Sequence, residues 1–338
     1  MGLPVSRIAS VLLPMPLPEA FDYAEPEGMG LAVGDHVAVP LGPRLARGVV
    51  TALRDAAGGN RPLKPVREKL DDLPLPETTL RFVEWAAKYS VELPGYPLAM
   101  ALRGLRAPKP RPLKLIEATG QAPGRMTPAR EKVLAAATTP MPPADLAARA
   151  GVSAGVVKGL VEEGSLVIRL EAAQVRFDAL DTQSPSPELN PGQAAAAEVL
   201  VGMVQAGGFQ AALLDGVTGS GKTEVYLEAV VAALNADPTA QVLVLLPEIA
   251  LTQAVMARFQ DRFGGSPAEW HSAVPPPRRR QVWEGVASGQ ARIVVGARSA
   301  LFLPYTNLKL IVVDEEHDGS FKQEEGFIYQ ARDMAVAR

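Results

Sequence analysis

Gly216-Val-Thr-Gly-Ser-Gly-Lys222-Thr223 is the stretch of sequence that decides the fold. It matches the phosphate-loop pattern G-x-x-x-x-G-K-[ST] at every fixed position. The apolar residues 211–215 before it predict a strand, and residues 223–234 after it predict a helix. A glycine-rich turn between a strand and a helix lets backbone N–H groups surround a polyphosphate at the positive end of the helix. The stretch therefore predicts a nucleotide site in an α/β domain.

The residues of this loop supply the predicted nucleotide contacts. Lys222 would reach the β- and γ-phosphates, and the Thr223 hydroxyl would hold Mg²⁺, so ATP and Mg²⁺ are the expected cofactors. An ordinary glycine-rich turn is the competing interpretation, which the flanking pattern disfavours. The predicted nucleotide-binding residues of the loop are Gly216, Thr218, Gly219, Ser220, Gly221, Lys222 and Thr223.

Apolar runs alternate with helical segments from Asn190 onward, at residues 211–214, 241–246, 292–295 and 308–313. This pattern predicts a parallel sheet covered on both faces. The last run leads into Asp314-Glu-Glu-His317. Because ligands of such sheets bind at the carboxyl ends of strands, we expect this segment beside the phosphate loop.

Two carboxylates of that segment have predicted catalytic roles together with Lys222. Asp314 would hold Mg²⁺ through water, and Glu315 would orient the attacking water and take its proton. A solvated acidic turn after a strand is the alternative. The presence of a full phosphate-loop motif in the same domain favours the catalytic interpretation of the two carboxylates.

The first 102 residues predict a separate β-rich domain. Short apolar runs separated by glycine turns fill residues 1–72 and indicate a small barrel or sandwich. Residues 77–91 predict an appended helix with Leu80, Val83, Ala87 and Val91 on one face.

Residues 103–114 predict a linker, because five basic side chains and three prolines occur there without an acidic residue. We favour a solvated hinge, and a phosphate contact made by the hinge is the alternative.

Residues 115–178 have the outline of a winged helix, with three short helices followed by wing strands at 166–170 and 174–177. The third helix carries Lys158 as its only base, which favours a packing role over DNA reading. Residues 179–189 predict a second linker, and residues 190–338 the nucleotide-binding domain.

The composition excludes several classes of protein and of binding site. The 338 residues contain no cysteine, which excludes disulfides and thiolate metal sites. We expect a cytoplasmic protein without a membrane segment, because there is no 18-residue apolar run and no signal-peptide pattern. The net charge of −3 provides no overall basic footprint for nucleic acid.

The loop after His317 is unusually aromatic, with Phe321, Phe327 and Tyr329 in a chain that is 5% aromatic. We interpret it as a stacking surface for unpaired bases, with burial in the domain as the alternative. His317 adjoins the acidic pair and can link it to this loop. Upstream, the Gln193 amide is able to pair with an adenine edge, although an ordinary surface glutamine is preferred from the residues alone.

Several segments together resemble the PriA family of replication-restart DNA helicases (primosomal protein N′) of superfamily 2. They are G-V-T-G-S-G-K-T-E-V-Y, L-P-E-I-A-L-T-Q, G-A-R-S-A-L-F, I-V-V-D-E-E-H-D-G-S-F-K-Q-E-E-G and A-R-D-M-A. The resemblance covers the whole chain. It implies a 3′-DNA-binding domain at the start, then a winged helix, and an adenine contact by Gln193. It also implies that the loop with Phe321, Phe327 and Tyr329 couples DNA to ATP, with Phe327 in place of an expected tryptophan. The implied pocket for a nascent-strand 3′ end consists of Phe21, Asp22, Tyr23, Gly42 and Lys64.

The resemblance implies an ATP-dependent 3′→5′ DNA helicase that recognises abandoned forks and starts primosome assembly. Forked DNA, single-stranded DNA-binding protein and primosome proteins are the implied partners. Family members continue with a second motor lobe, a zinc region and a C-terminal domain, so zinc is expected only there. We therefore expect this chain alone to bind DNA and nucleotide, to hydrolyse slowly and not to unwind.

Two other classes compete with this interpretation. The chain could be a fork-recognition module whose nucleotide site reports conformation rather than driving a motor. It could also be a small-molecule P-loop kinase or ATPase, which the two N-terminal extensions and the Asp314-Glu-Glu-His317 segment disfavour.

Overall fold

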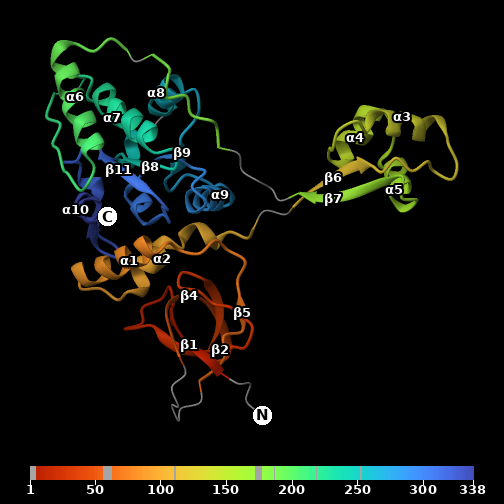
Figure 1. Ribbon diagram of the computed structural model, residues 1–338, viewed down its shortest axis with the longest axis horizontal. Helices are drawn as coiled ribbons and strands as arrows, with labels where there is room; N and C mark the ends of the chain where they lie inside the picture. The colour runs from red at the N-terminus through yellow and green to blue at the C-terminus, as the bar shows by residue number, and fades with distance from the viewer. Residues whose placement is uncertain are drawn as a thin grey trace. The chain divides into compact units, whose positions relative to one another are not determined.

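The computed structural model describes residues 5–55, 63–109, 112–171, 177–185, 187–217, 219–251 and 253–338. The chain divides into two compact units (Figure 1). Residues 1–107 and 176–338 belong to the first unit, and residues 108–175 to the second.

The first unit begins with a five-stranded antiparallel sheet, which confirms the predicted β-rich domain. Its strands lie in the order β2-β1-β4-β3-β5, and Figure 1 shows them curving around their own core. Alternate residues such as Val11, Val37 and Val50 are buried in that core. The strands are β1 (Val5–Leu12), β2 (Phe21–Pro26), β3 (His36–Leu41), β4 (Arg44–Asp55) and β5 (Glu68–Lys69).

Three short helical segments follow, namely α1 (Glu77–Tyr89), α2 (Gly95–Ala101) and the 3-10 helix η1 (Arg103–Arg106). Helix α1 buries Phe82, Val83 and Ala87. Val91 was predicted on the same face, and that prediction is wrong. The helix ends before it, and Val91 has φ +52° and a 91% exposed side chain.

The C-terminal half of this unit contains a four-stranded parallel sheet in the order β11-β8-β10-β9, as the alternating pattern predicted. Val242 and Val244 of β8 face one core with α7 and α8, and Leu243 and Leu245 face the core on the other side. Both faces are therefore covered. The short strand β9 has no counterpart in the prediction. The elements are α6 (Pro191–Ala206), α7 (Lys222–Ala236), β8 (Gln241–Leu245), η2 (Glu248–Ala250), α8 (Gln253–Phe263), β9 (Ala268–Trp270), α9 (Pro276–Ala287), β10 (Ile293–Gly296), η3 (Arg298–Phe302), β11 (Leu308–Val313), η4 (Gly319–Phe321), β12 (Lys322–Gln323), β13 (Tyr329–Gln330) and α10 (Ala331–Ala337).

The strand predicted before the phosphate loop, at residues 211–214, does not form. The described residues from 207 to 217 have no regular secondary structure, and Leu213 is 80% exposed. Gly207 and Gly208 both adopt positive φ and turn the chain after α6. An apolar run becomes a strand only where a sheet edge pairs with it, and this segment pairs with none of the described strands.

The second face of the parallel sheet shares its core with the N-terminal helices. Phe82 and Leu98 belong to one buried cluster with Trp283, Val294 and Phe302. The predicted boundary at residue 102 therefore lies inside a compact unit. The predicted linker also differs, because its first residues form η1, whose Leu105 is only 6% exposed.

The second unit contains β6 (Leu113–Ala118), α3 (Pro128–Ala136), α4 (Pro143–Ala150), α5 (Ala154–Glu162) and β7 (Leu166–Glu171) around one core. Strand β7 pairs antiparallel with β6, so its observed partner begins inside the predicted linker. Most of the predicted second wing strand, residues 174–176, lies outside the described residues. The winged-helix assignment stays a prediction. Lys158 of α5 lies 3.6 Å from Glu162 and is solvent-exposed.

Of the helices that the structure describes, none combines the length and apolar character that a bilayer crossing requires.

Candidate nucleotide and DNA sites

The phosphate loop turns through two glycines with left-handed backbone, Gly219 (φ +81°) and Gly221 (φ +80°). A side chain at Gly221 would also collide with the Gln193 amide nitrogen. Helix α7 begins at Lys222, whose Nζ donates to the Gly216 carbonyl across the loop over 2.6 Å. Thr218 of the predicted set lies outside the described residues.

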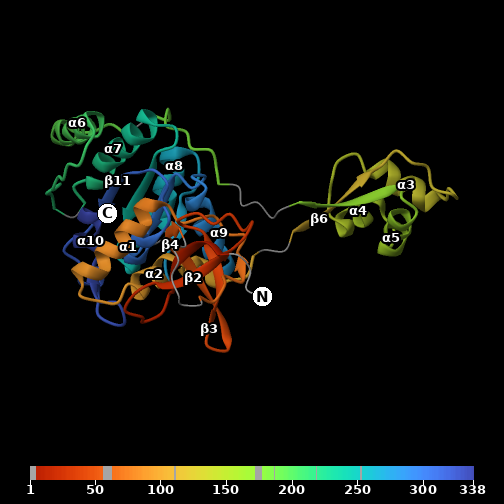
Figure 2. The same ribbon diagram turned by 60° about the horizontal axis from the view of Figure 1, so that its bottom comes forward.

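Gln193 joins the loop to helix α6. Its backbone N–H donates to Asn190 Oδ1 (3.0 Å), its Oε1 accepts from the Asn190 N–H (2.9 Å), and its Nε2 donates to the Ser220 carbonyl (2.8 Å). The first two bonds make a capping box that starts α6. Figure 2 shows α6 and α7 running side by side. Both ends of the Gln193 amide are engaged by the chain itself, and its adenine contact stays a prediction.

Strand β11 carries Asp314 to the side of α7. The Asp314 N–H continues the sheet by donating to the Leu245 carbonyl (3.0 Å), and its Oδ1 accepts from the Glu315 N–H (3.0 Å). Its Oδ2 accepts a hydrogen bond of 3.3 Å from the Tyr226 hydroxyl. Tyr226 stands three residues after Thr223, and residues so spaced are neighbours on a helix surface. The fold therefore brings Thr223 and Asp314 to one tyrosine.

Tyr226 has no place in the sequence-based prediction. It is 6% exposed, and its pKa is raised by burial and by the Asp314 charge, while the Thr223 hydroxyl acts in the opposite direction. The phenol therefore stays protonated and donates to the carboxylate. Its spacing from Thr223 was the only available signal, because nothing in the sequence relates it to Asp314.

The pair Thr223 and Asp314 fits a magnesium ion. Mg²⁺ takes one or two protein oxygens and completes its octahedron with phosphate oxygens and water. A hydroxyl and a carboxylate meeting at Tyr226 meet that requirement. Among the described residues, no group of three His, Asp or Glu gathers as a metal site of its own.

The acidic turn after β11 holds Glu315 in left-handed backbone (φ +51°), a conformation that is costly for a residue with a side chain. Its carboxylate lies 3.6 Å from His317 Nε2, and the neighbouring Glu316 pairs with Arg332 at 2.8 Å. Glu315 is the predicted base, and the fold holds its backbone in an uncommon geometry.

The aromatic loop differs from its predicted form. Phe321, Phe327 and Tyr329 are between 1% and 5% exposed, so no ring presents a free face for a base. Phe327 stacks on Tyr329 with centroids 5.1 Å apart, and both rings meet Phe302 edge-on. The alternative that these rings are buried in the domain is therefore the one observed. Burying three aromatic side chains removes a large apolar area from water, which stabilises the folded loop.

The loop is tied to the acidic turn and to η3. The Asp318 carboxylate accepts from the Ser320 N–H (2.7 Å) at the start of η4. The Arg298 guanidinium donates to the Ser320 carbonyl and to the Lys322 carbonyl (2.9 Å). Arg298 was not among the predicted site residues.

The five residues predicted to hold a 3′ end surround strand β2. Tyr23 is 4% exposed, and its hydroxyl donates to the Pro40 carbonyl (3.3 Å), close in sequence to Gly42 of the β3–β4 turn. Lys64 is placed beside β2 by its carbonyl, which accepts from the Ala24 N–H (3.0 Å). Successive strand residues face opposite sides. Tyr23 and the partly buried Phe21 therefore line the core, whereas Asp22 faces solvent.

The partners of Asp22 among the described residues include Ser10 and Arg54, which the sequence did not suggest. Its Oδ1 accepts from the Ser10 hydroxyl (2.8 Å), and its Oδ2 pairs with the Arg54 guanidinium. Ser10 lies opposite Asp22 in the β1–β2 register.

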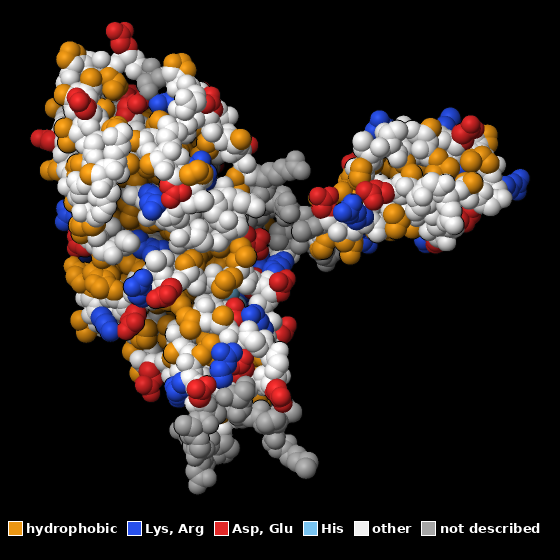
Figure 3. Space-filling view, in the orientation of Figure 1, with side chains coloured by type: hydrophobic (Ala, Val, Ile, Leu, Met, Phe, Trp, Pro, Cys, Tyr) orange, Lys and Arg blue, Asp and Glu red, His pale blue; other side chains and the backbone are white. Residues whose placement is uncertain are grey.

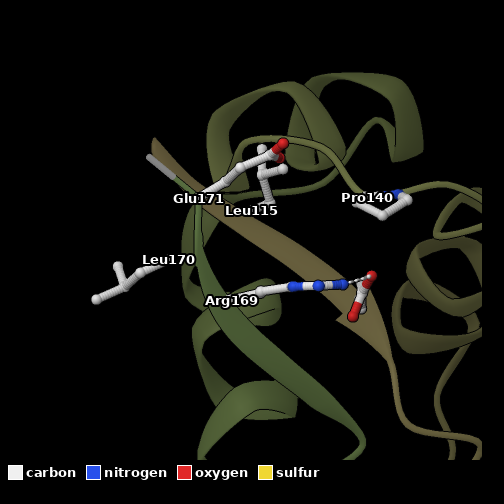
Figure 4. Close-up of a pocket in the computed structure, with 6 residues that line it drawn as sticks. Leu115, Pro140, Arg169, Leu170 and Glu171 are labelled. Carbon is white, nitrogen blue, oxygen red and sulfur yellow. Dashed lines mark hydrogen bonds and ion pairs between the residues drawn. The ribbon is translucent and has the colours of Figure 1, made fainter. Parts of the chain in front are cut away.

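A separate recess of about 390 Å³ lies in the second unit (Figure 4). Its basic group, Arg169, points toward Glu117, 3.4 Å away. None of the predicted site residues lines it. On the face seen in Figure 3, basic and acidic side chains are interspersed, in keeping with the small net charge.

Two family models match separate parts of the chain. Residues 10–103 match the model of the 3'DNA-binding domain (3'BD) of PriA, and residues 190–336 match that of the DEAD/DEAH box helicase.

The chain is similar to curated relatives named replication restart protein PriA, two of which match 98% of it. The relative from Rickettsia felis is 30% identical over 98% of this chain and 41% of its own length. The relative from Haemophilus influenzae is 35% identical over 98% of this chain and 47% of its own length. The relative from Bacillus subtilis is 36% identical over 59% of this chain. The chain thus spans less than half the length of these relatives and matches their N-terminal portion.

Proposed function

Because the chain belongs to the family of replication restart protein PriA, we propose that it acts in an ATP-dependent 3′→5′ DNA helicase that recognises abandoned replication forks and initiates primosome assembly. One observation carries the nucleotide part of this proposal. Tyr226 joins the helix that starts at the phosphate loop to Asp314, at the carboxyl end of β11. That is where ligands of open α/β sheets bind.

Nucleotide binding uses groups that the fold already aims at the loop. When a nucleotide binds, Lys222 would give up its hydrogen bond to the Gly216 carbonyl and contact the β- and γ-phosphates instead. The backbone N–H groups at the start of α7 would donate to the same phosphates. Thr223 and Asp314 would hold Mg²⁺, which would supply positive charge against the charge that develops on the phosphate. Glu315 orients the attacking water and accepts its proton.

Coupling to DNA runs through the segment that follows Glu315. His317 lies beside Glu315, and Asp318 fixes the start of the aromatic loop through Ser320. We propose that a change in the acidic turn is passed to this loop, whose aromatics Phe321, Phe327 and Tyr329 are packed in one buried cluster.

Recognition of the fork is assigned to the β-rich domain. The solvent-facing Asp22 would accept a hydrogen bond from a free 3′-OH, and Lys64, which is exposed beside β2, would contact the last phosphate. Single-stranded DNA-binding protein and primosome proteins are the proposed partners.

The test of fork recognition compares two synthetic forks, one with a free nascent 3′-OH and one with that end phosphorylated. Fluorescence anisotropy at a stated salt concentration measures binding by the 338-residue chain. We expect a preference for the free 3′-OH that Asp22→Ala abolishes. Glu27→Ala is the matched control, because it removes the same charge from an exposed turn of the same domain. Equal binding of the two forks by the parent chain would refute the assignment.

A fork-recognition module with a non-motor nucleotide site is the competing proposal. The substitution Lys222→Ala in the whole protein separates the two. Lost unwinding with intact fork binding supports the motor, and unchanged fork remodelling supports the module. For the chain alone we propose DNA and nucleotide binding with slow turnover and no unwinding, so vigorous DNA-stimulated hydrolysis by residues 1–338 would count against that part.

A further inference from the structure

Asp22 belongs to a closed ring of hydrogen bonds on the exposed face of the β-rich domain. The Ser10 hydroxyl donates to Asp22 Oδ1 (2.8 Å), and the Arg54 guanidinium pairs with Asp22 Oδ2. Arg54 Nη1 also donates to the Ser10 hydroxyl oxygen (3.1 Å). Each of the three side chains therefore contacts the other two.

The order of the strands creates this ring. Strand β1 lies between β2 and β4 in the sheet (Figure 1). Ser10 of β1 stands directly opposite Asp22 of β2. Arg54 is on β4, opposite Ile8, so its side chain reaches across β1 to the carboxylate on the far strand. Three neighbouring strands thus hold one carboxylate, and neither Ser10 nor Arg54 was among the predicted site residues.

The ring fixes the direction of the hydrogen bonds at Asp22. Because the Ser10 oxygen accepts from Arg54, its single hydroxyl hydrogen is committed to Asp22. An ionised carboxylate accepts several hydrogen bonds and donates none, and the Asp22 side chain is 37% exposed. A group that reaches it from solvent must therefore be a donor, as a 3′-OH is. A terminal phosphate would instead bring its negative charge against that of the carboxylate.

Arg54 supplies the balancing positive charge. An ion pair as exposed as this one, with Arg54 53% exposed, contributes little to stability, so its main effect is on the charge that a ligand meets. With Asp22 present, the two charges offset each other. Without Asp22, the guanidinium and the Ser10 hydroxyl are two neighbouring donors on the same face, and such donors bind phosphate oxygens.

We propose that Ser10 and Arg54 are positioning residues of the 3′-end site, and that Arg54 is a phosphate-binding group whose charge Asp22 neutralises. Asp22 then decides which end group the site accepts. With the carboxylate in place the site takes a 3′-hydroxyl, and without it Arg54 and Ser10 take a terminal phosphate. The inference rests on the proposed recognition of a nascent 3′ end, and it adds the origin of the selectivity.

The test uses the two forks described above and measures binding by residues 1–338 through fluorescence anisotropy, at about 50 mM and about 200 mM salt. Asp22→Ala is expected to lose the preference for the free 3′-OH and, beyond that, to bind the phosphorylated fork roughly threefold to fivefold more tightly than the free one. Because this reversed preference comes from an exposed charge, it should shrink at the higher salt concentration.

Two double variants assign the reversed preference to Arg54. Asp22→Ala/Arg54→Gln should bind both forks equally, because the cation is gone. Asp22→Ala/Arg54→Lys should keep part of the preference for phosphate, since lysine retains the charge without the planar fork. A purely structural role of Arg54 would not separate lysine from glutamine in this way. Asp22→Ala/Arg81→Gln is the matched control, because Arg81 belongs to an exposed ion pair of α1, and it should behave as Asp22→Ala does.

The outcomes separate this inference from the proposed function. A reversed preference in Asp22→Ala that Arg54→Gln removes supports the inference. Equal binding of the two forks by Asp22→Ala, or a reversed preference that persists without Arg54, overturns it, while a 3′-OH preference of the parent chain still supports fork recognition. The absence of any preference in the parent chain overturns both. If Asp22→Ala fails to fold, the isosteric Asp22→Asn decides by the same reversal, because it removes the charge and keeps the side-chain volume.

Discussion

The Tyr226 hydroxyl donates to Asp314 Oδ2 over 3.3 Å, although 88 residues separate the two in the chain. This bond keeps the predicted magnesium ligand facing the helix that carries Thr223. Because burial raises the pKa of Tyr226, its hydroxyl keeps the proton at neutral pH and continues to donate to Asp314.

Tyr226→Phe should therefore raise the Mg²⁺ concentration needed for half-maximal binding of a fluorescent ATP analogue by roughly tenfold, the equivalent of one lost hydrogen bond to a charged group. Nucleotide titrations at a series of Mg²⁺ concentrations measure this shift. The control is Tyr305→Phe, which removes a buried hydroxyl whose partner among the described residues is the Ala300 carbonyl (3.2 Å). An equal Mg²⁺ dependence in both variants would contradict the role of Tyr226.

Asp72 should be one of the costliest positions to change. Its carboxylate is 4% exposed and pairs with Arg47 (2.6 Å) and with the buried Arg280 of α9. Among the described residues, Asp72→Ala leaves the buried Arg280 with Glu284 as its one remaining carboxylate partner. The free energy of unfolding should therefore fall by about 3–5 kcal/mol. Urea denaturation measures it. Glu77→Ala, which breaks an exposed pair with Arg81, should cost less than about 1 kcal/mol. If Asp72→Ala and Glu77→Ala lowered the free energy of unfolding by similar amounts, the Asp72–Arg280 pair would not be stabilising the contact between the N-terminal half and α9.

His36 should make stability fall on acidification. It is fully buried against Trp283, with ring centroids 5.8 Å apart, and burial lowers its pKa to about 4 despite the opposing charge of Asp72. The unfolded chain, with a histidine pKa near 6.5, therefore binds more protons than the folded chain between these values. Stability is retained above pH 6.5 and is lost as the pH falls toward 4.

Between pH 7 and pH 5 the wild type should lose about 2 kcal/mol more stability than His36→Leu, which fills the site without titrating. Urea unfolding followed by tryptophan fluorescence at both pH values provides the comparison. Asp72, Arg47 and Asp35 face His36 in both proteins, so their contributions largely cancel in the difference. Parallel pH profiles would show that His36 is not the titrating group.

Gly104 should not tolerate a methyl group. Its added Cβ would collide with the Trp283 side chain, so Gly104→Ala should lower stability by about 1–3 kcal/mol through overpacking. Gly202→Ala is the matched control, because that glycine lies exposed inside α6 with open space around it. The control should gain about 0.5–1 kcal/mol of stability from restricted unfolded-state freedom. Thermal unfolding of both variants tests the pair, and a neutral Gly104→Ala would argue against tight packing of η1.

The sequence by itself determined the elements whose signals are local. The phosphate loop with helix α7, the strands β8, β10 and β11, and the β-rich start all follow from glycine placement and from apolar runs of strand length. These elements are specified by residues only a few positions apart, so a short segment of sequence is enough to predict them. The same holds for the start of α1, although its end before Val91 depended on a backbone turn.

Only the tertiary structure decided which of those segments meet. Residues 211–214 have the composition of a strand but remain unpaired among the described residues, and the rings at 321, 327 and 329 are buried rather than offered to bases. The bond from Tyr226 to Asp314 joins two segments that are far apart in the chain. Pairing, burial and charge proximity depend on partners far away in sequence, so no local pattern of residue types specifies them.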